Sequence, residues 1–272
     1  MKTIVLKFGG ASIFDMASLL RIFNIFVEFK KTYDTVYGVF SAPKGQTRAL
    51  ENIYNEHHSN RQKLADEILK YLFIFWLNFG YINPEHLNAL TKDIRKNISK
   101  IKPEMLKAYV LHLGEHITVN IITAIFANQD KGTVINIDPK EFLFTKGTNP
   151  NDQEIDLVNS KRLFQNLPKV SNCIITIGGF FGFNDYGITL LGFDGSDYSA
   201  TAVSQILGLD KVHLFKNLGD SLKFDLELSK ELDKEHGAKT VPPKAWNLSK
   251  IWNIEIMIVN INNHKQSFKY SE

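Results

Sequence analysis

This sequence of 272 residues has a single cysteine, short apolar runs and only a small excess of positive charge. The one cysteine, Cys173, excludes a disulfide framework. It lies in an apolar run without an activating neighbour, so we predict a buried strand residue and not a nucleophile. The most apolar segment, Tyr71–Leu77, is far shorter than the roughly 20 residues of a membrane span. Met1–Lys7 becomes charged before a signal peptide could develop, so we expect a soluble cytoplasmic protein with no membrane partner.

Basic and acidic residues nearly balance, with 32 lysines and arginines against 29 aspartates and glutamates. These charges are spread along the chain, so they form no basic tail or stripe of the kind that binds nucleic acid. We therefore expect no nucleic-acid partner, and the formal charge of +3 suits an anionic small molecule. Hydrophobic residues make up 44% of the chain, which is enough for a full core and excludes intrinsic disorder.

Short runs rich in valine, isoleucine and phenylalanine alternate with longer segments of helical periodicity. This alternation predicts an α/β fold in which helices cover a mainly parallel sheet. The predicted strands are Thr3–Phe8, Thr35–Phe40, Thr133–Ile137, Cys173–Ile177, Lys211–Phe215 and Glu255–Val259. The predicted helices are Asp15–Lys31, Arg61–Phe79, Pro84–Ile98, Pro103–Asn128, Asp156–Leu167, Asp197–Leu207, Leu226–Glu235 and Pro243–Trp252. The helical pattern from Glu51 to Asn128 predicts a helical insertion, and the polar loop Thr145–Asp152 predicts a boundary between two lobes.

Two loops that follow predicted strands contain residues suited to anion binding. In the first, Gly9 and Gly10 let backbone N–H groups approach an anion closely, and the next helix points its positive end the same way. Lys7 adds a charge that can stabilise a transferring phosphoryl group. The second loop, within Ser41–Leu50, places hydroxyls, a glycine and two cations at the carboxyl end of a strand. Taken alone, each loop is also compatible with an ordinary connection.

A third loop, within Leu190–Ala200, places glycines and acidic residues before a predicted helix. Ser196 and Asp197 open this helix, so Ser196 fits the role of an N-terminal cap. Asp197 beside glycines also fits the acidic residue by which a phosphotransferase holds a metal ion or a substrate ammonium group. This loop alone does not decide between the two interpretations.

Six motifs, in order along nearly the whole chain, resemble those of aspartate kinases. Lys7–Ser12 is similar to their opening KFGGTS, and Ser41–Thr47 to their second-strand loop SAMGGVT. Leu113–Glu115 resembles their helix-borne glutamate motif. The other three are Gly179–Asn184, Leu191–Ala200 and His236–Ala245, similar to GFIGAN, LGRGGSDYSA and FGAKVLHPRA. On these motifs the chain is identified as a member of the aspartokinase branch of the amino acid kinase superfamily.

The resemblance implies one domain over residues 1–272 with the three-layer α/β/α sandwich of the amino acid kinase (carbamate kinase-like) fold. Residues 1–150 would form the substrate lobe and residues 151–272 the nucleotide lobe. The implied reaction is ATP-dependent phosphorylation of the side-chain carboxylate of L-aspartate to 4-phospho-L-aspartate, as in lysine biosynthesis. ATP and Mg²⁺ would take part, with no metal held by protein ligands. Such transfer needs positioning and charge neutralisation more than covalent catalysis.

The resemblance also implies roles for individual residues. Lys7 would stabilise the moving phosphoryl group, and Asp197 would organise that lysine and the substrate. Ser41, Thr47 and Glu115 would bind the amino acid, with Glu115 pairing with its ammonium group. The residues expected to contact the nucleotide or its phosphates are Gly9, Gly10, Gly195, Ser196 and Lys239.

The sequence departs from the family pattern at two places. Phe193 and Asp194 replace the arginine and the next glycine of LGRGGSD, and phenylalanine cannot make the bidentate contact by which that arginine grips a carboxylate. The segment Lys216–Asp220 corresponds to the family's TDVDG, and the connection from there to His236 is much shorter than usual. Because the chain ends soon after the strand Glu255–Val259, we also expect no regulatory ACT domains.

Two rivals to an aspartate kinase follow from these departures. One is a degenerate or repurposed member of the family with a binding or regulatory role, and the other is a kinase for a different carboxylate. Phe193 and the short connection favour these rivals, whereas Lys7, Glu115, Asp197 and Lys239 favour an enzyme.

The segment His112–His116 formally matches the zinc-peptidase pattern H-x-x-E-H. A glycine within that helix and the lack of an indicated third ligand argue against zinc hydrolysis. The aromatic stretches Ile22–Phe26 and Phe73–Trp76 predict core positions or a subunit interface, and a homodimer is compatible with the latter.

Overall fold

The six predicted strands assemble into one sheet in the computed structural model, which describes residues 1–80, 84–130, 132–217 and 241–270. A seventh strand completes the order β11-β10-β9-β1-β2-β6-β3, and every neighbouring pair is parallel except β10–β11. These strands are β1 (Thr3–Phe8), β2 (Thr35–Phe40), β3 (Thr133–Asn136), β6 (Cys173–Gly178), β9 (Lys211–Lys216), β10 (Glu255–Asn260) and β11 (Asn263–Lys269). The helices are α1 (Met16–Lys30), α2 (Gln46–His57), α3 (Arg61–Asn78), α4 (Pro84–Lys100), α5 (Pro103–Gln129), α6 (Leu157–Gln165), α7 (Gly195–Ile206) and α9 (Pro243–Trp252).

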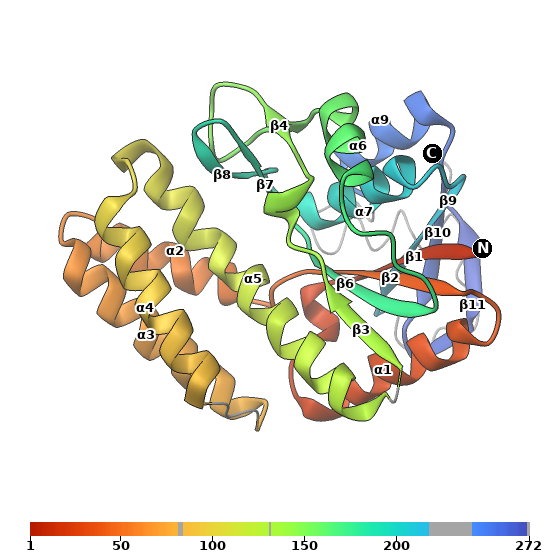
Figure 1. Ribbon diagram of the computed structural model, residues 1–272, viewed down its shortest axis with the longest axis horizontal. Helices are drawn as coiled ribbons and strands as arrows, with labels where there is room; N and C mark the ends of the chain where they lie inside the picture. Colours follow the sequence, from red (N-terminus) through yellow and green to blue (C-terminus); the bar gives the residue numbers. More distant parts are fainter. Residues whose placement is uncertain (81–83, 131, 218–240, 271–272) are drawn as a thin grey trace.

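Helices cover both faces of this sheet (Figure 1). Helices α1 and α5 lie on one face, and α6, α7 and α9 lie on the other. In β1 the alternation of side chains sends Leu6 and Phe8 into the core beneath α1 and α5, and Val5 into the core beneath α7. All three are fully buried, which explains why the strand is apolar on both sides. The three-layer α/β/α sandwich expected from the sequence is confirmed.

Helices α2, α3 and α4 form an arm beside the sheet, and α5 joins this arm to the sandwich (Figure 1). This arrangement confirms the helical insertion, although its first helix already begins at Gln46. In the described chain, α5 is the helix long and apolar enough by composition to cross a membrane, and 72% of its 18-residue apolar window is buried inside the protein. Such burial is typical of a core helix. Strand residue Cys173 is also buried, as predicted.

Three antiparallel pairings were not predicted. β11 is an edge strand of polar sequence, so its residues lack the alternation that marks a half-buried strand. The pairs β4 (Thr145–Lys146) with β5 (Glu154–Ile155), and β7 (Phe181–Asn184) with β8 (Gly187–Leu190), have strands too short for a readable period. The predicted boundary loop therefore contains β4, and the predicted helix over 226–235 lies outside the described residues.

The carboxyl ends of β9, β1, β2 and β6 lie side by side along one edge of the sheet. The chain leaves β1 toward β2 on one side and returns to β9 on the other, so β1 is a switch point of the kind beside which α/β proteins bind ligands. The Ser41 N–H donates to the Phe8 carbonyl at 3.1 Å, and the Gly179 N–H donates to the Phe40 carbonyl at 2.8 Å. The loops singled out in the sequence thus meet at this edge.

We expect Phe126→Ala to lower the free energy of unfolding by about 3–5 kcal/mol, the usual result of removing a buried phenylalanine ring. Phe126 is fully buried and makes edge contacts with Phe23, Phe26 and Phe40, so it joins α5 to α1 and β2. Urea unfolding followed by circular dichroism measures the change. The matched variant Phe73→Ala removes a 48% exposed ring of α3 and should leave stability nearly unchanged. Equal effects of the two substitutions would contradict this description of the core.

Candidate active site

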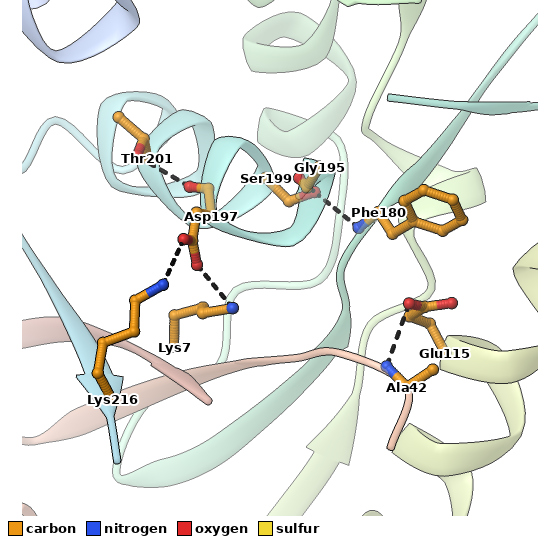
Figure 2. Close-up of polar contacts among 9 residues, drawn as sticks. All are labelled: Lys7, Ala42, Glu115, Phe180, Gly195, Asp197, Ser199, Thr201 and Lys216. Carbon is orange, nitrogen blue, oxygen red and sulfur yellow. Dashed lines mark hydrogen bonds and ion pairs between the residues drawn. The ribbon is translucent and has the colours of Figure 1, made fainter. Parts of the chain in front are cut away.

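An ion triad occupies the carboxyl ends of β1 and β9. The Asp197 carboxylate lies 2.6 Å from the Lys7 ammonium through Oδ1 and 2.8 Å from the Lys216 ammonium through Oδ2 (Figure 2). The Asp197 side chain is 2% exposed and that of Lys7 is 7% exposed, whereas that of Lys216 is 25% exposed. The Asp197 carboxylate therefore links the first turn of α7 to the ends of β1 and β9.

Burial and charge act in opposite directions on these groups. Burial tends to raise the pKa of Asp197, but the charges of Lys216 and Lys7 outweigh burial and hold that pKa at about 2. Burial lowers the pKa of Lys7, an effect that Asp197 opposes and Lys216 reinforces. Burial and the charge of Asp197 raise the pKa of Asp194, while Lys216 and Lys7 pull it down. The two lysines thus hold the Asp197 carboxylate in its charged form.

Helix α7 carries Asp197 in its first turn, and the turn after β6 packs against the start of this helix. The Ser199 hydroxyl donates to the Gly195 carbonyl at 2.9 Å and accepts from the Phe180 N–H at 3.1 Å (Figure 2). Phe180 has φ +71°, a left-handed conformation uncommon for a bulky residue. A Cβ atom on Gly179 would lie 2.6 Å from the Ser196 Cβ, so only glycine lets β6 approach α7 this closely.

Glu115 is the second buried titratable group of this edge. Its Oε1 accepts from the Ala42 N–H at 3.1 Å (Figure 2), and its backbone carbonyl lies next to Gly178 at the end of β6. Among the described residues, its Oε2 is buried without a hydrogen-bond partner. Burial raises the pKa of Glu115 to about 8, against the opposing effects of its backbone hydrogen bonds and the Lys7 charge. A buried carboxylate with one open oxygen suits a cationic group of a ligand.

The glycine loop after β1 has one open position and one crowded one. A Cβ atom on Gly9 would lie 3.4 Å from the Lys7 ammonium, so this glycine leaves the approach to Lys7 uncovered. A Cβ atom on Gly10 would overlap the Ala42 carbonyl, so Gly10 lets the first two loops pack together. Ser41 follows β2 and is half-buried beside this turn, and Thr47 is half-buried in the first turn of α2.

The remaining predicted residues divide between packing positions and undescribed ones. Ser196 is 6% exposed and packs against Gly179, and Gly195 is buried against Leu191 and Phe180. The predicted role of Gly195 at the nucleotide stays a prediction. Lys239 lies outside the described residues.

Two lysines at this edge were missed by sequence reasoning. Lys216 was assigned to the nucleotide segment but not to the site, and the structure brings it to Asp197. Lys244 of α9 donates to the carbonyls of Gln153 and Leu191 at 3.1 and 3.0 Å and pairs with Asp152, so it ties α9 to the loop before α7. Lys216 directly follows the predicted strand Lys211–Phe215, whereas Lys244 lies inside the predicted helix Pro243–Trp252 and the motif His236–Ala245.

The family arginine has no substitute in Phe193. The Phe193 side chain is 84% exposed, and Asp194 adopts the left-handed φ of +55° at the position of the family glycine. Asp194 keeps the backbone shape of that glycine at the start of α7.

The zinc-peptidase interpretation of His112–His116 does not fit the geometry. His112 is buried with Nδ1 against the Tyr109 carbonyl, and His116 Nδ1 lies 3.7 Å from Asp138, whereas Glu115 contacts Ala42. Within the described ranges, no group of three or more His, Cys, Asp or Glu side chains is placed to hold a metal ion.

The chain is similar to aspartokinases in sequence. The bifunctional aspartokinase/homoserine dehydrogenase of Buchnera aphidicola is 27% identical over 96% of this chain and 35% of its own length. The aspartokinase of Chlamydia pneumoniae is 25% identical over 83% of this chain and 50% of its own length. This chain therefore spans half or less of the length of these curated relatives.

Solved structures of low identity share the fold. E. coli aspartokinase III in complex with aspartate and ADP aligns with a TM-score of 0.77 at 19% identity, over 100% of this chain and 65% of that one. Aspartate kinase of Clostridium acetobutylicum aligns with a TM-score of 0.71 at 19% identity, over 100% of this chain and 64% of that one. Residues 2–219 match the amino acid kinase family, and because this match covers most of the sequence, the chain belongs to that family.

Proposed function

We propose that this chain is an ATP-dependent kinase that phosphorylates the side-chain carboxylate of L-aspartate. The observation that carries the proposal is the triad of Lys7, Asp197 and Lys216 at the switch point of the sheet. Two cations on one anion leave positive charge where a phosphoryl group would move, and phosphoryl transfer depends mainly on such charge neutralisation. The aspartokinase relatives, and the aspartate and ADP held by the E. coli structure, support the choice of substrates.

The reaction needs no general base from the protein. An aspartate side-chain carboxylate is ionised at neutral pH, so its oxygen can attack the γ-phosphorus directly. The new bond joins this oxygen to phosphorus, the bond to the β,γ-bridging oxygen breaks, and its electron pair leaves on ADP. Lys7 would neutralise the charge of the moving group, and Asp197 would hold Lys7 in position. This arrangement is electrostatic stabilisation by groups that are oriented in advance.

The phosphates and their metal would be held by different groups. We assign phosphate contacts to Gly9, Gly10, Ser196 and Lys239. Both Asp197 oxygens are engaged by lysines, so this carboxylate is not arranged as a metal ligand. Mg²⁺ bound to phosphate oxygens and water is the usual coordination of this ion in kinases, where it neutralises phosphate charge.

The acceptor would lie on the other side of Lys7. The open Oε2 of Glu115 would receive the substrate ammonium group, with Ser41 and Thr47 contributing hydroxyls to the same amino acid. Exposed Phe193 favours a second candidate, a kinase for a carboxylate acceptor that keeps an amine but lacks the second carboxylate of aspartate.

We expect purified protein with MgATP, L-aspartate and hydroxylamine to form aspartyl hydroxamate. Lys7→Ala should lower the rate by about 10²–10³, the usual effect of losing a group that stabilises transition-state charge. Lys2→Ala removes an exposed lysine just before the same strand and should leave the rate unchanged. A hydroxamate formed with another amino acid but not aspartate would favour the second candidate. No hydroxamate with any acceptor would contradict kinase activity.

We also expect aspartate binding to release a proton at pH 7. The pKa of Glu115 is about 8 in the free protein, so its carboxyl group is mostly protonated at pH 7 and must ionise to pair with an ammonium group. Affinity should therefore rise with pH up to about 8 and then level off. Calorimetry with MgADP present, in buffers of different ionisation enthalpy, measures the released proton.

Glu115→Gln should weaken aspartate binding and abolish its pH dependence, since the amide does not ionise. Glu104→Gln, at an exposed position in the first turn of the same helix, provides the matched control. Binding by the wild type that is independent of pH between 6 and 8, without proton release, would exclude Glu115 as the ammonium partner.

A further inference from the structure

We propose that Lys216 is a second phosphate-binding cation, which contacts the nucleotide phosphates and the moving phosphoryl group from the β9 side while Lys7 contacts them from β1. This inference rests on the proposed kinase function and assigns that site a residue that the family motifs do not predict. The segment Lys216–Asp220 corresponds to TDVDG, so this chain has a lysine where the motif has a neutral threonine.

The position of Lys216 at the end of β9 is the first argument. Asp197 holds its ammonium group at 2.8 Å, and 25% of its side chain is exposed, compared with 7% for Lys7. An ammonium group has three N–H donors, and the contact with Asp197 uses one of them. Lys216 is therefore oriented by the protein and still accessible to a ligand.

Charge is the second argument. Two ammonium groups in direct contact with one carboxylate leave one unmatched positive charge, and burying unmatched charge is unfavourable. Asp194 affects these charges from farther away, and among the described residues it makes no ion pair with either lysine. An anionic ligand at this place would complete the pairing.

The order of strands indicates that this anionic ligand is the phosphate donor and not the acceptor. Glu115 contacts Ala42 after β2 and lies next to Gly178 at the end of β6, so the acceptor side of the site is the β2–β6 side. β9 lies on the opposite side of β1, and adjacent strands are about 4.8 Å apart. Lys7 on β1 therefore stands between the acceptor and Lys216, which places Lys216 beside the phosphate donor.

The test measures binding of MgADP and of the non-hydrolysable β,γ-imido analogue of MgATP by calorimetry, together with kcat and KM. Lys216→Thr introduces the residue of the family motif, and Asp197 keeps its contact with Lys7 in this variant. We expect at least tenfold weaker binding of the analogue, a smaller loss for ADP and a lower kcat, with the acceptor KM unchanged. Lys216→Arg should restore most of the affinity because it keeps the charge.

Lys211→Ala is the matched control, since Lys211 begins the same strand and pairs with Glu255 at 2.9 Å away from the site. It should bind both nucleotides like the wild type. Wild-type nucleotide affinity and kcat in Lys216→Thr, or a change confined to the acceptor KM, would overturn the proposal. A wild type that binds no nucleotide would overturn this inference and the kinase function together. If it binds nucleotide but does not phosphorylate aspartate, weaker binding in Lys216→Thr would still support this inference while the proposed acceptor fails.

Discussion

The Asp197 carboxylate, held between the ammonium groups of Lys7 and Lys216, is the interaction on which the rest of the site depends. A carboxylate that is 2% exposed is stable in its charged form only when it is paired, and here the two lysines reverse the effect of burial on its pKa. The three residues belong to α7, β1 and β9. A shift of any one of these elements would leave a buried charge unmatched, so the triad fixes their relative positions as well as the charge that a ligand meets.

The close approach of α7 to the strand ends has a local conformational cost. Phe180 and Asp194 both have positive φ angles, which side chains disfavour, and Gly179 must lack a Cβ for Ser196 to fit. The Ser199 hydroxyl accepts from the Phe180 N–H and Lys244 donates to the Leu191 carbonyl, and these bonds hold the two flanking loops in these shapes. Local preference is thus overridden where the chain brings Asp197 to the lysines, as expected when a site rather than the fold sets the geometry.

The sequence predicts much of this arrangement and misses the parts set by strand order. The six main strands follow from apolar runs, and Lys7, Asp197 and Glu115 follow from motifs in family order. Lys216 escapes because a lysine at the end of a strand has the pattern of an exposed flank, and its partner lies 19 residues earlier in the chain. The pairing of β9 with β1 and the packing of α7 on both strands bring them together, and hydrophobic periodicity carries no information on either. Gly195 follows from a motif, and the structure adds that it packs closely against Leu191. The role of Lys239 stays a prediction.

The free protein holds two polar groups that are each incompletely paired. The triad has two lysines on one carboxylate, and Glu115 has a buried oxygen without a hydrogen-bond partner among the described residues and a pKa raised to about 8 by burial. The proposed acceptor carries an ammonium group for Glu115 and a carboxylate that would react near Lys7, while the donor would bring phosphate charge to the Lys216 side. In the proposed reaction, each substrate would therefore complete the pairing of one group. Because the fixed lysines would neutralise the charge of the moving phosphoryl group as it develops, binding and catalysis would depend on the same electrostatic arrangement.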